Sequence, residues 1–128
     1  MSSNVYLNFK QNIKIDDFLS FCKKHNISFS PNTVGQNYFY QDQVQIQVSG
    51  EGTLPEDEFG RPIFSQAKPP ASFNEICIGS YFMSNLDMIA TCASSMLKCW
   101  SGVYDASPEL EEYMKDAMAI EGSFKSNE

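Results

Sequence analysis

The spacing of apolar and polar residues predicts alternating strands and helices along most of the chain. Residues 5–9 place Val5, Leu7 and Phe9 on one side and polar or amphipathic residues on the other, which is typical of a half-buried strand. Residues 15–26 then repeat apolar residues at helical spacing, with acids in the first turn and lysines in the last, as the helix dipole favours. We therefore expect a strand followed by a helix.

Further segments have strand character. Residues 27–30 and 74–82 are short β-prone stretches, and residues 38–50 contain the clearest strand pattern of the chain. Within that pattern, residues 43–48 alternate glutamine with valine or isoleucine, so one side is apolar and the other is a row of amides. The amide row is either the solvated outer face of an antiparallel sheet or a surface that hydrogen-bonds a partner.

A helix over residues 86–100 is apolar around most of its circumference, which predicts the buried central helix of the fold. Ser84 or Asn85 is the expected N-cap because short polar side chains accept hydrogen bonds from exposed helix amides. Gly102 is the expected stop, since glycine is common directly after a helix.

A final helix is predicted to start after Ser107 as N-cap, with Pro108 in its first turn, and to end at Gly122. Residues 123–128 are expected to fray. The order of elements predicts one α+β domain over residues 1–128. Its architecture is expected to be a two-layer sandwich, with a mainly antiparallel sheet of about four to five strands packed on helices, two of them C-terminal.

Residues 50–73 have no apolar period and contain four prolines and three glycines. The segment includes the stretch LPEDEFGRPIF, residues 54–64, and is acidic at its centre. A connection of this length exceeds the ~12–15 residues beyond which loops are usually functional or disordered. We therefore expect a long acidic loop with a role of its own.

Charge narrows the possible ligands. The net charge is −7, and from Glu51 onward thirteen acids face five bases. Direct nucleic-acid binding requires clustered Lys and Arg, so we expect none, and a basic protein partner fits the excess of acids. The opening MSSNVYLNFK has no signal-peptide pattern and no apolar run is long enough to span a bilayer, so we expect a cytoplasmic protein without membrane contact.

The sequence contains no catalytic, cofactor or metal motif, so we do not expect an enzyme. The four cysteines include no CxxC pair, and His25 is the only histidine. The glycines near residue 50 do not form a phosphate loop, and the acids after Pro55 lack the spacing of a calcium loop. A pocket that gathers His25, a cysteine and a carboxylate would favour the enzyme alternative.

Two acidic surfaces are the candidate partner contacts. Aromatic anchors ringed by polar groups are typical of binding hot spots, and the long loop combines both. The alternative is that its phenylalanines pin the loop to its own domain. The candidate contact residues are Glu56, Asp57, Glu58, Phe59, Phe64, Glu109, Glu112 and Asp116.

The stretch ICIGSYFMSNLDMIATCASSMLKCWSGVYDASPEL, a strand, a buried helix and an acidic helix, resembles small acidic bacterial toxin-immunity proteins in general character. The resemblance implies a non-enzymatic inhibitor that covers the active site of a toxin, and the charge favours a basic toxin or nuclease as the partner. We expect a monomer or homodimer. The alternatives are a phage inhibitor of host defence nucleases and an accessory subunit of a larger complex.

Overall fold

The computed structural model describes residues 3–29, 36–80 and 84–125. The last residue of the stretch expected as a strand over 27–30, the end of the one expected over 74–82 and the chain end after residue 125 lie outside them. In chain order the elements are β1 (Ser3–Lys14), α1 (Ile15–Lys24), β2 (Ile27–Phe29), β3 (Asn37–Tyr40), β4 (Val44–Val48), the 3₁₀ turn η1 (Phe64–Gln66), β5 (Ser72–Ser80), α2 (Leu86–Cys99), β6 (Gly102–Ala106) and α3 (Pro108–Lys125).

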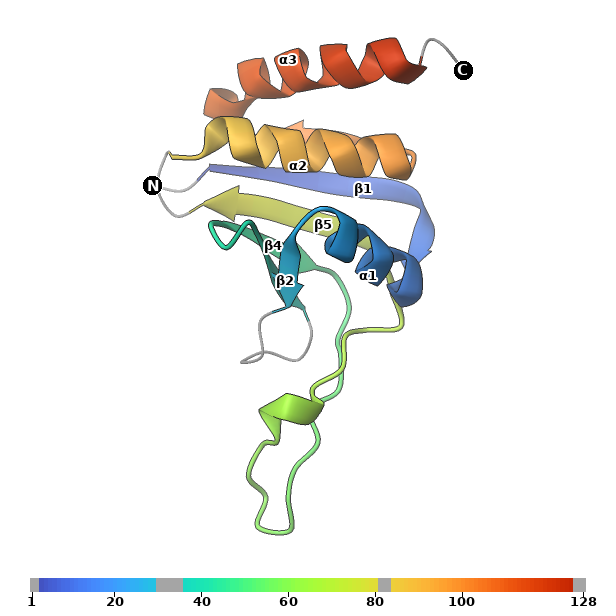
Figure 1. Ribbon diagram of the computed structural model, residues 1–128, viewed down its shortest axis with the longest axis vertical. Coiled ribbons are helices and arrows are strands. Elements are labelled where there is room, and N and C mark those ends of the chain that lie inside the picture. The colour runs from blue at the N-terminus through green and yellow to red at the C-terminus, as the bar shows by residue number, and fades with distance from the viewer. Residues whose placement is uncertain (1–2, 30–35, 81–83, 126–128) are drawn as a thin grey trace.

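The strands form one antiparallel sheet in the order β2-β3-β4-β5-β1-β6, packed against the three helices (Figure 1). The predicted α+β class is confirmed, with six strands in place of about four to five. The additional strands are β3, which the sequence pattern merges with β4, and β6, which it misses. Because β1 lies between β5 and β6, the first strand is interior and the late strand β6 is at an edge.

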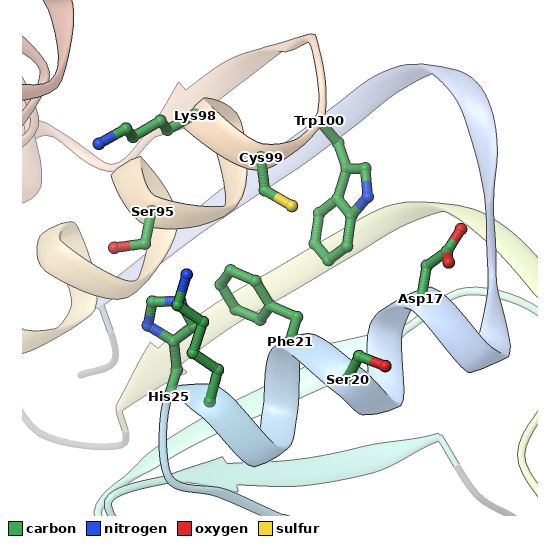
Figure 2. Close-up of a pocket in the computed structure, with 9 residues that line it drawn as sticks. Asp17, Ser20, Phe21, His25, Ser95, Lys98, Cys99 and Trp100 are labelled. Atoms are coloured by element: carbon green, nitrogen blue, oxygen red, sulfur yellow. The ribbon is translucent and has the colours of Figure 1, made fainter. Parts of the chain in front are cut away.

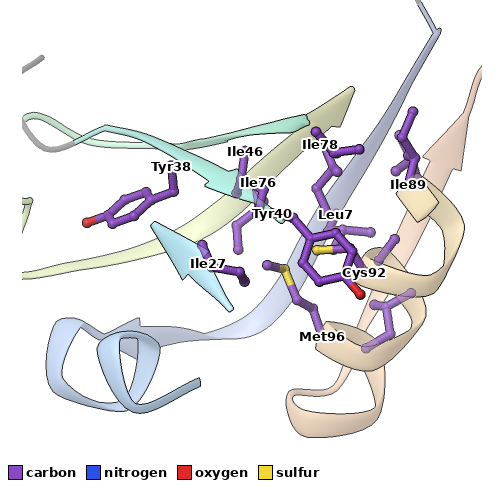
Figure 3. Close-up of a cluster of buried hydrophobic side chains, with 14 of the residues drawn as sticks. Leu7, Ile27, Tyr38, Tyr40, Ile46, Ile76, Ile78, Ile89, Cys92 and Met96 are labelled. Carbon is purple, nitrogen blue, oxygen red and sulfur yellow. The ribbon is translucent and has the colours of Figure 1, made fainter. Parts of the chain in front are cut away.

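The hydrophobic core lies between the sheet and the helices. Alternate residues of β1, among them Val5 and Leu7, point into it, as do Ile46 of β4 and Ile78 of β5. Figure 3 shows these strand side chains directed toward those of α2, including Met96. The predicted burial of α2 is confirmed, since seven of its residues are buried.

The strand β1 is longer than its apolar pattern predicts. The pairing with β5 shifts between Asn8 and Ile13, which marks a β-bulge or similar irregularity. The residues between them are polar and exposed apart from Phe9, and Ile13 returns to the core at 3% exposure. Because the irregularity breaks the period of two, the sequence pattern predicted a strand only over residues 5–9, whereas β1 continues to Lys14.

The turn between β3 and β4 explains why one strand was predicted there. Gln41 and Asp42 both have positive φ, 50° and 61°, and the Gln43 amide donates to the Tyr40 carbonyl at 3.1 Å. Two successive left-handed residues match the hairpin turns that usually contain Asn-Gly or Asp-Gly. Gln-Asp is not such a signal, so the turn was not visible in the sequence.

Gly102 begins β6, and the prediction that it only ends a helix is wrong. A Cβ at this position would lie 2.5 Å from the Asn8 carbonyl oxygen, so only glycine lets β6 approach β1 this closely. The strand is short, and its Val103 is exposed while Tyr104 is half-buried. It therefore has no clear apolar side, which is why its pattern gave no signal.

The start of α3 agrees with the prediction, since the helix begins at Pro108 directly after Ser107, whereas the cap of α2 and the end of α3 differ from it. Asn85 precedes α2 with φ of 59° and makes no side-chain cap hydrogen bond. The Ser107 hydroxyl accepts from the Asn4 amide and donates to the Asn4 carbonyl, both at 3.1 Å, so it ties the start of α3 to β1. The helix α3 continues through Gly122 to Lys125, because one internal glycine costs a helix only about 1 kcal/mol.

Candidate functional site

Residues 50–71, named the arm here, connect β4 to β5 and project away from the sheet and helices (Figure 1). Thr53 and Lys68 pair across its two limbs through backbone hydrogen bonds of 2.9 and 2.8 Å. Nearer the tip, the Ile63 amide donates to the Pro55 carbonyl at 2.9 Å. The predicted loop is therefore a paired two-limbed structure.

The Asp57 carboxylate organises the tip of the arm. One of its oxygens accepts from the Phe59 and Arg61 amides, both at 2.9 Å, and the other accepts from Arg61 Nε at 3.2 Å. Gly60 has a φ of +77°, a left-handed conformation that glycine adopts easily, and this lets the chain reverse direction between Phe59 and Arg61. Because Asp57 is engaged within the turn, the acids that the tip presents to solvent are Glu56 and Glu58.

Both phenylalanines of the arm are exposed. Phe59 at the tip is 72% exposed and Phe64 in η1 is 41% exposed. The Arg61 guanidinium lies over the Phe59 ring, 5.0 Å from its centroid, and holds the ring beside the turn. The alternative in which the two rings pin the loop to the core does not describe this arm.

The second predicted contact surface is on α3, at the opposite end of the molecule from the arm (Figure 1). Glu109 accepts a 2.7 Å hydrogen bond from Ser3, and this bond is the main reason why the pKa of Glu109 lies below its usual value. Glu112 Oε1 lies 3.8 Å from Lys115 Nζ, and the Asp116 side chain is exposed. The structure does not bring the two acidic groups together, so one cleft would have to span the molecule to reach both.

A recess that the sequence did not indicate lies between α1 and the end of α2. A pocket of about 610 Å³ includes Phe21, Lys24, Lys98 and Trp100 in its lining (Figure 2). A neighbouring pocket of about 490 Å³, against the end of β1, shares Asp17, Cys99 and Trp100 with it. The two adjoining pockets are called the basic groove here.

The basic groove gathers a cluster of lysines from separate elements. Lys10 and Lys14 come from β1, Lys24 from α1 and Lys98 from α2. The chain has nine lysines and arginines, and these four are among them. Of its sixteen aspartates and glutamates, only Asp17 lines either pocket. Lys98 lies far from the other three in the sequence, and only the fold brings the end of α2 beside α1 and β1.

His25, Cys99 and Asp17 line the first pocket, the combination that would favour an enzyme. Figure 2 shows them spread along it, with the rings of Phe21 and Trp100 between His25 and Asp17. Burial raises the pKa of the Cys99 thiol, and the partial opposition of Lys24 does not reverse this. A thiol with a raised pKa is less ionised at neutral pH and is therefore a weaker nucleophile.

The sheet face opposite the helices carries a mixed polar and apolar surface. The side chains of Gln47, Cys77, Tyr6 and Asp105 lie in one row across four neighbouring strands. Tyr6 is 58% exposed and Val103, near it on β6, is 66% exposed. Gln45 is half-buried and Gln47 exposed, so the predicted amide row is part of this face.

The fold and these surfaces define an α+β protein with a projecting acidic arm and a separate basic groove. No known protein family model, curated protein sequence or solved structure matches this chain. In the described part of the chain, no helix has the length and apolar character needed to cross a membrane. Over the same residues, His, Cys, Asp and Glu side chains form no group of three or more suited to a metal ion.

Proposed function

We propose that this chain is a non-enzymatic inhibitor that binds a basic protein through the tip of the arm. One observation carries the proposal: Phe59, 72% exposed, sits at a fixed turn between the exposed acids Glu56 and Glu58 and the guanidinium of Arg61. An aromatic anchor surrounded by polar groups is the usual composition of a binding hot spot.

The arm is suited to binding because its tip is already ordered. Burying a phenylalanine side chain is worth about 1.5–3 kcal/mol. Ordering a flexible loop on binding costs conformational entropy, which reduces that gain. Three hydrogen bonds to Asp57 already hold this turn before binding, so less of the gain is lost. A narrow projecting element also suits insertion into a concave site.

Charge supports a basic partner. The chain has a net charge of −7, and Glu56 and Glu58 are exposed at the tip. Complementary charge mainly accelerates encounter and selects among partners, while the apolar anchor supplies the lasting contact. A cationic cleft that accepts an aromatic ring therefore fits the tip better than a neutral surface does.

We further propose that the partner is a toxin effector with a basic active site. The support is the general resemblance of residues 76–110 to small acidic bacterial immunity proteins, together with an arm shaped to occupy a cleft. A phage-encoded inhibitor of a host nuclease would use the same physical features. The nature of the captured partner, a secreted toxin or a host defence enzyme, separates the two roles.

The test uses two matched aromatic truncations. The partner is captured from the native host with the wild-type chain, and its affinity is then measured for Phe59→Ala and for Tyr113→Ala, which removes an exposed aromatic from α3. Loss of a hot-spot aromatic costs about 2 kcal/mol or more, so we expect Phe59→Ala to weaken binding by at least about tenfold and Tyr113→Ala to change it little. Equal effects of the two variants would contradict the proposal.

The sheet face with Tyr6 and Val103 favours a second candidate function, an accessory subunit of a larger complex. Exposed apolar residues on an uncovered sheet are common at subunit interfaces. Sedimentation of the purified chain separates the candidates, because a stable multimer would favour the subunit role and a monomer the inhibitor.

A further inference from the structure

We propose that the basic groove is a binding site for a small organic phosphate that carries a planar ring, the chemistry of a nucleoside monophosphate. Its first pocket, about 610 Å³, lies within the about 300–1,000 Å³ common for small-molecule sites. The lining combines aromatic rings with lysine ammonium groups, and each part matches one part of such a ligand.

The lysines favour a phosphate. Lys10, Lys14, Lys24 and Lys98 line the two pockets against the single acid Asp17, in a chain whose net charge is −7. Charges farther than about 8 Å are largely screened at physiological salt, so the local lysines outweigh the distant acids for a ligand inside the groove. Lysine is a common phosphate ligand that acts as a point charge.

The aromatic residues favour a planar ring. Trp100 is half-buried and lines both pockets, and its indole packs against Phe21 and Phe9 with ring centroids 5.0 and 6.0 Å away. Phe21 also stacks on His25 with ring centroids 4.1 Å apart, so the rings of His25, Phe21 and Trp100 follow one another along the first pocket (Figure 2). Stacking of a base on such a ring is worth about 1–3 kcal/mol.

Asp17 gives the site a direction. It lines both pockets, as Trp100 does, whereas the lysines lie in one pocket or the other. A carboxylate repels phosphate but accepts hydrogen bonds from hydroxyl and amino groups. The ring and its hydroxyl or amino substituents therefore fit beside Trp100 and Asp17, with the phosphate in the first pocket on the side of Lys24 and Lys98.

The site is independent of the inhibitor function. It is built by α1, α2 and the end of β1, and no residue of the arm lines it. Failure of ligand binding would leave partner binding by the arm untouched, and the reverse also holds.

Trp100 provides the measurement, because it is the only tryptophan of the chain. Its fluorescence is titrated with adenosine monophosphate, adenosine and inorganic phosphate, and each titration is repeated by calorimetry. We expect saturable binding of the monophosphate with a Kd below about 1 mM, and binding of adenosine and of phosphate that is at least about tenfold weaker, since each retains only half of the contacts.

Lysine substitutions locate the site. The double variant Lys24→Gln, Lys98→Gln should weaken monophosphate binding by at least about tenfold. The matched control is Lys68→Gln, Lys115→Gln, which removes the same charge from the arm and α3 and should leave binding unchanged. All four side chains are exposed, so the folds of both variants are expected to survive.

Three results would overturn the proposal. The first is no saturable fluorescence or heat signal up to about 10 mM monophosphate, well above the expected Kd. The second is equal weakening by both lysine pairs, which would indicate unspecific attraction. The third is displacement of the monophosphate by a single-stranded oligonucleotide at far lower concentration, which would make the groove a nucleic-acid site.

Discussion

The arm and α3 carry similar charge in opposite structural settings. In the arm, Glu56 and Glu58 are exposed just before Phe59, which the turn presents to solvent. In α3, Glu109 is bound by Ser3 and the helix buries Leu110 and Met114 in the core. The comparison shows that an acid-rich segment of the sequence can fold either as an exposed turn or as a helix with one side packed on the core.

The largest expected effect concerns what each region contributes to stability. Met114→Ala, at a fully buried position of α3, should lower the free energy of unfolding by about 2–5 kcal/mol, because it leaves a cavity in the core. Phe59→Ala should change it by no more than about 0.5 kcal/mol, since the ring is exposed. Chemical denaturation measures both, and a large loss for Phe59→Ala would show that the arm is part of the fold.

A smaller effect is expected at Glu109, the acid of α3 that accepts a hydrogen bond from Ser3. The hydrogen bond from Ser3 lowers the pKa of Glu109 below its usual 4.5. The ionised carboxylate therefore stabilises the fold fully above pH 4.5, and this stabilisation is lost as the pH falls through the lowered pKa. The difference in stability between wild type and Glu109→Gln should therefore be present at neutral pH and shrink below pH 4.5.

The Ser3→Ala background is the control for this pH dependence. Without the Ser3 hydroxyl, Glu109→Gln should show a smaller dependence on pH, because the main cause of the lowered pKa is gone. A pH dependence that is the same in both backgrounds would contradict the assigned role of Ser3.

Much of the fold could be predicted because its core follows simple periods. Val5 and Leu7 alternate on β1, and Ile89, Ala93 and Met96 repeat along α2, so burial could be inferred from spacing alone. The parts that were missed depend on local geometry. An irregularity after Asn8, a left-handed turn at Gln41 and a contact that only Gly102 allows have no reliable sequence signal.

The candidate surfaces were predictable only where their residues are contiguous in the sequence. The arm was recognisable because its acids and phenylalanines lie within eleven consecutive residues, 54–64. The exposure of Phe59 could not be predicted from the sequence, because it depends on the turn that Asp57 forms. The basic groove was invisible because its lysines come from β1, α1 and α2.

The central claim, that the partner meets the arm and not α3, is tested most directly by association rates. Two double reversals, Glu56→Lys with Glu58→Lys and Glu112→Lys with Asp116→Lys, change the net charge equally, one on the arm and the other on α3. Local charge steers the final approach of a complementary partner. We predict that the arm reversal slows association by at least about tenfold at low salt, with the difference fading as salt rises, and that the α3 reversal has a clearly smaller effect. Equal slowing by both reversals, or unchanged association of the arm reversal, would contradict the claim.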